Sequence, residues 1–138
     1  MLRAFGAKIG RHVHIYPSVV IYLPWNLEVH DFGAIGDGAF IYNLAPVTVG
    51  SRATISHRAH LCGGTHDFTK RDFPLLRLPI RIGEQAWIGA DAFIGPGVTV
   101  NEGAVVGARA VVVKDVAPWM VVVGNPAREV KRREIVTK

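Results

Sequence analysis

Branched aliphatic residues recur at every sixth position over much of this chain, and in the C-terminal half the residue four places after each one is small or β-branched. The two C-terminal series are Ile82, Ile88, Ile94, Val100, Val106 and Val112, and Ala86, Ala92, Val98, Ala104, Ala110 and Val116. An amphipathic helix repeats every 3.6 residues and a half-buried strand every two, so neither explains this period.

The same spacing runs through the N-terminal half with two shifts of register. Its members are Ile9, Ile15, Ile21 and Leu27, then Ile35 and Ile41, then Val49, Ile55 and Leu61. A period of six fits a solenoid in which each hexapeptide makes one short strand and one corner, and three hexapeptides close a triangular coil. We therefore predict an all-β parallel β-helix over residues 1–124, with the aliphatic residues inside. In the C-terminal series the residue after each aliphatic is mostly glycine, which suggests unusual backbone angles there.

Two segments fall outside the repeat. The register fails between His66 and Ile82, and the intervening residues are rich in Phe, Leu and Pro. We predict a projecting loop at about residues 67–79 that packs over a neighbouring subunit. At the other end, Asn125 can cap a helix and Pro126 suits its first position. A short basic helix over residues 125–138 is therefore predicted.

Composition narrows the functional classes. No apolar run is long enough for a transmembrane helix, and the N-terminus lacks the apolar stretch of a signal peptide. The single cysteine, Cys62, excludes an intrachain disulfide and suits a reducing, cytoplasmic location. Three of the five net positive charges fall within residues 128–138. Because the basic residues cluster at one end and no nucleic-acid-binding signature is present, we expect no nucleic acid partner.

Four segments, together with the [Ile/Val/Leu]-Gly-x-x-[Ala/Val]-x repeat, carry a family resemblance: Ile41–Gly50, Gly64–Asp67, Ala86–Ala90 and Gly124–Arg128. They resemble the hexapeptide-repeat sugar O-acetyltransferases of the maltose, galactoside and nodulation type, and most closely those of colanic-acid and other exopolysaccharide biosynthesis. The resemblance implies a left-handed coil, although parallel crossovers are otherwise right-handed in about 98% of cases. It also implies acetyl-CoA as cosubstrate, a sugar or glycan acceptor, and a homotrimer with active sites between subunits. Many relatives carry an N-terminal segment before the repeats, whereas we expect this chain to start directly at the repeats, which leaves the acceptor open.

The candidate base is His66, which stands where the repeat breaks. An imidazole titrates near neutral pH and can accept a hydroxyl proton. The resemblance implies this role for the histidine of Gly64-Thr65-His66, with direct attack on the thioester in a ternary complex. In an extended segment Asp67 would point to the opposite face, so we expect it to contact the acceptor or the loop backbone. We interpret Cys62 as a small apolar residue of the coil rather than a nucleophile.

The resemblance implies further site residues. Asn43 and Trp87 would contact the acceptor, through an amide that donates and accepts and an indole that offers an apolar wall. Their structural alternatives are a corner asparagine in a left-handed conformation and packing in the trimer. The backbone amide of Ala90 would stabilise the oxyanion, and Ala108 and Lys114 would line the pantetheine channel. On the predicted helix, Arg128, Lys131 and Arg132 would share one face and bind the phosphates of coenzyme A.

Two rival functions remain open at this point. The γ-class carbonic anhydrases share such a β-helix and bind zinc through three histidines, and this chain has His57, His60 and His66. Two residues separate the first pair and five the second, which is not the ligand spacing of that class. We therefore expect no metal, and exposed positions for His57 and His60. A non-catalytic β-helix scaffold would need neither His66 nor a basic terminal helix.

Overall fold

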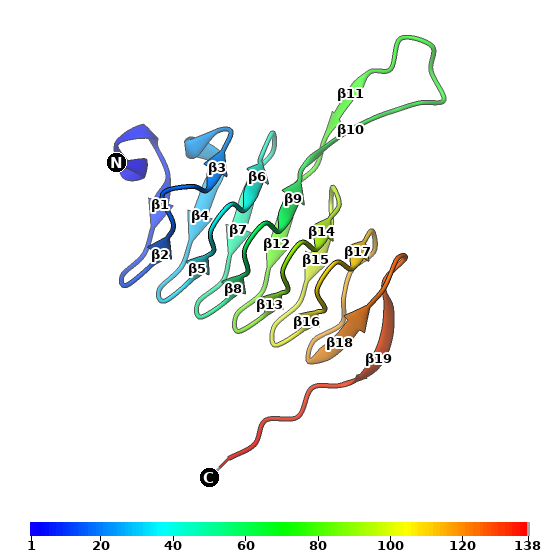
Figure 1. Cartoon of the computed structure of the whole chain (residues 1–138). Helices are drawn as coiled ribbons and strands as arrows, with labels where there is room; N and C mark the ends of the chain where they lie inside the picture. Colours follow the sequence, from blue (N-terminus) through cyan, green and yellow to red (C-terminus); the bar gives the residue numbers. More distant parts are fainter. Residues whose placement is uncertain (138) are drawn as a thin grey trace.

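The computed structural model describes residues 1–137, whose short strands stack into a three-sided parallel β-solenoid (Figure 1). Sheet A contains β1 (Lys8–Ile9), β4 (Leu27–Val29), β7 (Val47–Val49), β12 (Ile80–Ile82) and β15 (Thr99–Val100). Sheet C contains β3 (Val20–Ile21), β6 (Phe40–Tyr42), β9 (His60–Cys62), β14 (Phe93–Ile94) and β17 (Val111–Val112). Sheet B contains β2 (His14–Ile15), β5 (Ala34–Ile35), β8 (Thr54–Ile55), β13 (Trp87–Ile88), β16 (Val105–Val106), β18 (Met120–Val123) and β19 (Arg128–Arg132). Short 3₁₀ helices span Leu2–Phe5 and Pro24–Asn26.

The strand register confirms the predicted six-residue pattern. Ile82 of β12 pairs in parallel with Val49 on one side and Val100 on the other. Equivalent residues of successive coils therefore stack in columns inside the prism, and the aliphatic positions from Leu27 to Val112 are buried. The small residues four places later are buried with them, from Ala86 to Val116.

The glycines that follow aliphatic residues of the C-terminal series are not there for unusual backbone angles, as expected, but for lack of space. Gly83 and Gly89 do not have positive φ; the left-handed residues lie two places later, at Gln85 (φ 59°) and Asp91 (φ 57°). A Cβ on Gly83 would lie 2.5 Å from the Glu102 nitrogen, and one on Gly89 would lie 2.7 Å from the Ala108 nitrogen. Glycine is needed at these positions because the corners of adjacent coils approach too closely for a side chain.

The predicted projection is present as a β-hairpin. Strands β10 (Gly64–His66) and β11 (Leu75–Arg77) pair antiparallel, with His66 opposite Leu75. Figure 1 shows this hairpin extending away from the prism at the edge where sheet C passes to sheet A. The excursion thus begins at Gly64, a little before the predicted start at residue 67.

The predicted C-terminal helix is wrong. Residues Arg128–Arg132 form β19, which runs antiparallel to β18 with a bulge, and Asn125 and Pro126 lie in the turn between the two strands. An unpaired edge of β18 would leave peptide groups without partners, and the returning chain satisfies them. Lys138, the last residue of the predicted helical unit, lies outside the described residues.

Candidate active site

His66 is exposed on the hairpin, and one of its ring nitrogens is fixed. Its Nδ1 lies 2.7 Å from the carbonyl oxygen of Phe73, across the tip of the hairpin. A carbonyl oxygen can only accept a hydrogen bond, so Nδ1 carries the hydrogen. In the neutral imidazole, Nε2 is then the unprotonated nitrogen and can accept a proton. Phe73 itself adopts a left-handed conformation with φ 46° at this turn.

Asp67 orders the turn at the hairpin tip. Its Oδ1 accepts hydrogen bonds from the backbone nitrogen of Thr69 at 3.1 Å and from the Thr69 hydroxyl, while its own backbone N–H donates to the Pro74 oxygen at 3.0 Å. Of the two expected contacts, the structure therefore contains the one to the loop backbone. This turn leads into Phe73, whose carbonyl fixes His66.

Small residues mark the root of the hairpin. A Cβ on Gly64 would lie 2.9 Å from both the Tyr42 ring and the Leu44 Cδ1. The chain can therefore leave the prism directly over the preceding coil. The half-buried Cys62 thiol donates to the Gly64 carbonyl at 3.2 Å. This contact gives Cys62 a structural partner at the same root.

Asn43 is fully buried, and its amide is already engaged. Oδ1 accepts from the Leu23 nitrogen at 2.8 Å, and Nδ2 donates to the Leu23 oxygen at 2.7 Å. Asn43 also lacks the positive φ of the structural alternative considered for it. The side chain joins two coils within the chain, its oxygen and nitrogen each already have a partner, and it is buried, which argues against the predicted substrate contact.

Trp87, Ala90 and Ala108 lie close together where sheet B passes to sheet C. The Trp87 Nε1 donates to the Ser56 hydroxyl at 2.8 Å, and about half of the Trp87 surface is exposed (49%). Ala90 and Ala108 occupy equivalent corners of adjacent coils, where Arg109 N donates to Ala90 O at 2.8 Å. Within residues 1–137, no acceptor takes the Ala90 N–H. That N–H is therefore available to a developing oxyanion, as an oxyanion hole requires.

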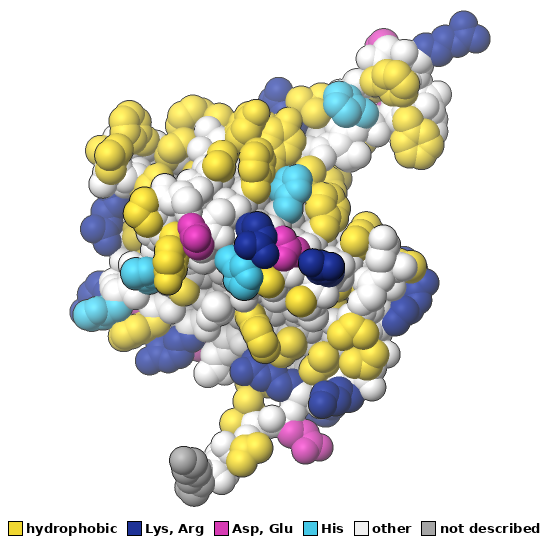
Figure 2. All heavy atoms as spheres, viewed as in Figure 1, with side chains coloured by type: hydrophobic (Ala, Val, Ile, Leu, Met, Phe, Trp, Pro, Cys, Tyr) yellow, Lys and Arg dark blue, Asp and Glu magenta, His cyan; other side chains and the backbone are white. Residues whose placement is uncertain are grey.

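This B–C edge also carries a row of charged residues that sequence reasoning missed, namely Arg58, Asp91 and Arg109. Arg58 donates from two nitrogens to the Asp91 carboxylate at 2.9 and 3.0 Å. That hydrogen bonding, with the positive charges of Arg58 and Arg109, holds the pKa of Asp91 below its ordinary value. Figure 2 shows charged and histidine side chains gathered between sheets B and C on the visible face. The signal was available, since Arg58, Asp91 and Arg109 each stand three places after a repeat aliphatic with alternating charge.

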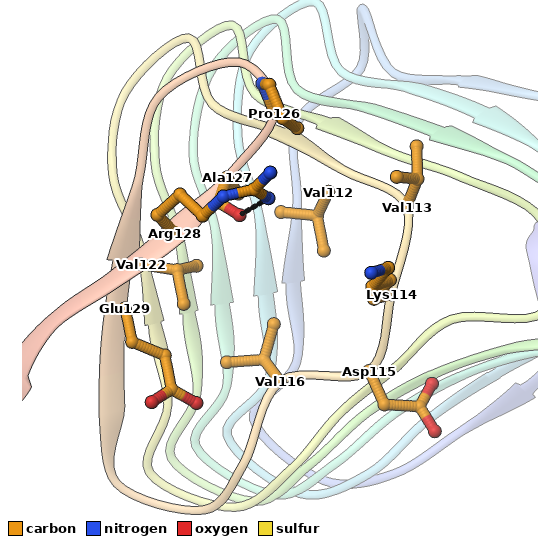
Figure 3. Close-up of a pocket in the computed structure, with 10 residues that line it drawn as sticks. All are labelled: Val112, Val113, Lys114, Asp115, Val116, Val122, Pro126, Ala127, Arg128 and Glu129. Atoms are coloured by element: carbon orange, nitrogen blue, oxygen red, sulfur yellow. Dashed lines mark hydrogen bonds between the residues drawn. The ribbon is translucent and has the colours of Figure 1, made fainter.

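The residues predicted to bind coenzyme A are only partly brought together. Lys114 and Arg128 lie on the rim of a hollow of about 390 Å³ at the C-terminal end of the prism, over a floor of Val112, Val116 and Val122 (Figure 3). Lys131 pairs opposite Val121 and Arg132 opposite Met120. Adjacent strand residues point to opposite faces, so the single basic face expected of a helix does not form.

The two remaining histidines of the zinc hypothesis have different surroundings. His57 is exposed, as expected, but His60 is half-buried on the outer side of sheet C between Phe40 and Phe93, with ring centroids 5.0 and 5.3 Å away. This burial lowers the pKa of His60. Within residues 1–137, no three His, Cys, Asp or Glu side chains converge as a metal site. The described helices are also too short to cross a membrane.

Comparison with known proteins places this chain among acetyltransferases. The family model for bacterial transferase hexapeptide (six repeats) matches residues 79–114. The putative colanic acid biosynthesis acetyltransferase WcaF of Escherichia coli K12 is 44% identical over 133 residues, which cover 96% of this chain and 73% of that protein.

Solved structures extend the likeness to nearly the whole fold. A hexapeptide-repeat-containing acetyltransferase from Vibrio cholerae O1 biovar eltor, complexed with acetyl coenzyme A, superposes with a TM-score of 0.91 at 26% identity, covering 97% of this chain and 75% of that one. Galactoside acetyltransferase in complex with coenzyme A gives a TM-score of 0.84 at 25% identity, covering 96% and 68%.

Proposed function

Because this chain belongs to the hexapeptide-repeat acetyltransferases, we propose that it transfers an acetyl group from acetyl-CoA to a hydroxyl of a sugar or glycan precursor, with His66 as general base. Acetyl-CoA dependence is supported by the solved relatives that bind acetyl-CoA or coenzyme A. A glycan acceptor, and with it a place in polysaccharide biosynthesis, is supported by the likeness to a putative colanic acid acetyltransferase.

The fixed ring of His66 is the observation that carries this proposal. The Nδ1–H bond to the Phe73 carbonyl leaves Nε2 as the basic nitrogen, on a hairpin that projects from a rigid prism. A general base needs this arrangement, because its free nitrogen must lie within hydrogen-bond reach of the hydroxyl proton. The hydroxyl oxygen attacks the thioester carbonyl carbon, His66 takes the proton, and the coenzyme A thiolate leaves.

The acetyl donor is assigned to the B–C edge. The free Ala90 N–H would stabilise the oxyanion, and Ala108, small and exposed, would leave room for the pantetheine arm. Lys114 and Arg128 would attract the coenzyme A phosphates as cations at the end of the prism. Lys131 and Arg132 would add to the positive field without sharing a face.

The separation of these parts supports a homotrimer with sites shared between subunits. The hairpin with His66 leaves the prism at the C–A edge, whereas Ala90 and Ala108 lie at the B–C edge, on the other side of sheet C. The base must reach the hydroxyl that attacks the thioester, so the base and the thioester must lie in one site. We therefore assign His66 of one subunit to the acetyl-CoA held by its neighbour. The aromatic outer side of sheet C, which carries Phe40, His60 and Phe93, would form part of the subunit contact.

The test is the release of free coenzyme A from acetyl-CoA with a panel of sugars. His66→Ala should lower turnover by about a hundred-fold or more, because general-base catalysis supplies about 10²–10⁴-fold. His14→Ala, which removes an exposed histidine from β2, is the matched control. Unchanged turnover in His66→Ala would remove His66 from this role, and an active monomer in light scattering would contradict the shared site.

A further inference from the structure

A second hollow lies on the other side of Trp87, where sheet A passes to sheet B. It encloses about 630 Å³, and Arg52, Thr54, Gln85, Ala86, Trp87, Trp119, Arg133 and Ile135 line it. The function proposed above assigns no role to any of these residues. The hollow therefore needs its own chemical interpretation.

Cation–π contacts restrain both arginines that line this hollow. Toward the N-terminus, the Arg52 Cζ lies 4.4 Å from the ring centroid of Phe32, whose ring stacks in turn on His12. Toward the C-terminus, the Arg133 Cζ lies 5.6 Å from the ring centroid of Trp119. Each aromatic contact restrains a side chain that would otherwise sample many rotamers.

Arg133 is held further by the backbone. Its Nη1 donates to the Gln85 oxygen at 2.8 Å and to the Gly103 oxygen at 3.1 Å. These carbonyls are neutral acceptors and leave the positive charge uncompensated. Among residues 1–137, no carboxylate lies within ion-pairing distance of Arg52 or Arg133. Two restrained positive charges without an ion-pair partner therefore line one hollow.

Trp87 gives the hollow a flat apolar wall. Its ring is tied by the Nε1 bond to Ser56, yet about half of its surface stays exposed (49%). Large exposed aromatic rings can stack on the apolar face of a sugar, and Thr54 and Gln85 add hydrogen-bonding groups beside it. Guanidinium groups bind carboxylates and phosphates in paired hydrogen bonds.

We propose that this hollow binds a sugar that carries an anionic group, either a carboxylate or a phosphate, with the sugar ring on Trp87 and the anion between Arg52 and Arg133. The inference rests on the proposed function for the role of that sugar as the acceptor. Trp87 connects this hollow with the proposed acetyl-CoA site, because the chain runs from Trp87 in β13 to the Ala90 corner within three residues.

Tryptophan fluorescence tests this binding without acetyl-CoA. Trp25→Phe removes the exposed tryptophan outside the hollow, so the remaining signal comes from Trp87 and Trp119. Glucuronate and glucose 6-phosphate should both change the emission saturably, and the one that binds more tightly identifies the anionic group. Glucose should bind about ten-fold more weakly than the better of the two, because it lacks the charge-assisted hydrogen bonds.

Variants separate this site from general electrostatics. Arg52→Gln should weaken binding of the anionic sugar by about ten-fold, and Arg52→Lys should recover part of the loss because it keeps the charge. Arg81→Gln makes the same charge change on the outer side of β12 in sheet A and should have no effect. Equal binding of glucose and the charged sugars would overturn the inference, and so would inorganic phosphate binding as tightly as glucose 6-phosphate.

The outcomes also distinguish this inference from the proposed function. His66→Ala should abolish transfer but keep the preference for the charged sugars over glucose, because neither the proposed ring stacking nor the proposed anion contacts involve His66. If neither glucuronate nor glucose 6-phosphate binds while coenzyme A release depends on His66, the inference alone is overturned. Binding of the charged sugar without any release of coenzyme A would support the inference and overturn the proposed function.

Discussion

The Asn43 side chain forms two hydrogen bonds with one residue of the preceding coil, from Leu23 N to Oδ1 and from Nδ2 to Leu23 O. It therefore continues the inter-coil hydrogen bonding at the edge where sheet C passes to sheet A. Asn43→Ala should reduce the free energy of unfolding by about 3 kcal/mol, because each backbone group left without a partner costs about 1–3 kcal/mol. Chemical denaturation measures this loss.

The matched control is Asn101→Ala. The Asn101 side chain is half-buried and makes one such bond, to the Val116 oxygen at 2.8 Å, so its loss should be smaller, about 1 kcal/mol. The acceptor KM of Asn43→Ala should equal that of the wild type at a temperature where both are folded. A large rise in that KM with unchanged stability would restore Asn43 to the acceptor site.

Asp67 is expected to act as a positioning residue through the hairpin tip. Asp67→Ala removes the acceptor for the Thr69 N–H and hydroxyl, which loosens the turn before Phe73 and hence the His66 ring. We expect kcat to fall about ten-fold, within the range that misplacement of a catalytic group can cause, while the melting temperature stays close to wild type.

The conservative variant Asp67→Asn keeps the accepting oxygen and should recover most of the activity. Asp72→Ala removes an exposed carboxylate from the same tip and serves as the control. Activity of Asp67→Asn as low as that of Asp67→Ala would mean that the charge of Asp67, rather than the turn, matters.

Gly83 and Gln85 stand at one corner of the solenoid, and substitutions there should affect the stability of the fold differently. Gly83→Ala would place a Cβ 2.5 Å from the Glu102 nitrogen and should destabilise the fold by about 1–3 kcal/mol, the usual cost of overpacking. Gln85→Gly relieves a left-handed residue, worth about 1–2 kcal/mol, and this gain is offset by glycine entropy. Denaturation should therefore find Gln85→Gly near wild type. A larger loss for Gln85→Gly than for Gly83→Ala would contradict the close-approach explanation.

The sequence predicted the solenoid because its core consists of one repeated contact. Each aliphatic residue meets its equivalent in the next coil, as Ile82 meets Val49 and Val100. The spacing of aliphatic residues in the sequence therefore equals the structural repeat of the solenoid. The reason for the glycines could not be predicted from the sequence pattern. A close approach between coils depends on distances that only the stacked structure defines, as at Gly83 and Glu102.

The C-terminal helix failed as a prediction for a related reason. Asn125-Pro126 and the spacing of Arg128, Lys131 and Arg132 are locally compatible with a helix. The competing requirement, partners for the edge of β18, is tertiary and overrides local propensity. The hydrogen bond that fixes Nδ1 of His66 could not be predicted either, because its partner Phe73 lies across a hairpin whose register the sequence did not specify.

The strand at the C-terminus leads to a graded prediction for acetyl-CoA. Lys114→Gln and Arg128→Gln, which alter the rim of the terminal hollow, should each raise the KM for acetyl-CoA about ten-fold, the effect of losing one charge-assisted hydrogen bond to phosphate. Lys131→Gln and Arg132→Gln should have smaller effects, because neither residue lines that hollow. Initial-rate kinetics at fixed ionic strength measure the four values. Equal effects of all four would indicate a diffuse positive field instead of a rim site.

His60 should make the stability of the fold depend on pH. Burial between aromatic rings lowers the pKa of His60, so the unfolded chain takes up this proton more readily than the folded chain. Its contribution to stability is complete above the ordinary histidine pKa, about 6.5, and is lost as the pH falls below that value toward the lowered one. His60→Phe keeps an aromatic ring between Phe40 and Phe93 and removes the titrating group. Denaturation from about pH 7.5 to 5 should therefore show the wild type losing stability relative to His60→Phe. Asp91, whose pKa is lowered, stays ionised throughout this range in both proteins and so adds no difference between them. Parallel curves for the two proteins would show that His60 titrates alike in the folded and unfolded chains, and the aromatic side of sheet C would then provide no pH-dependent stability.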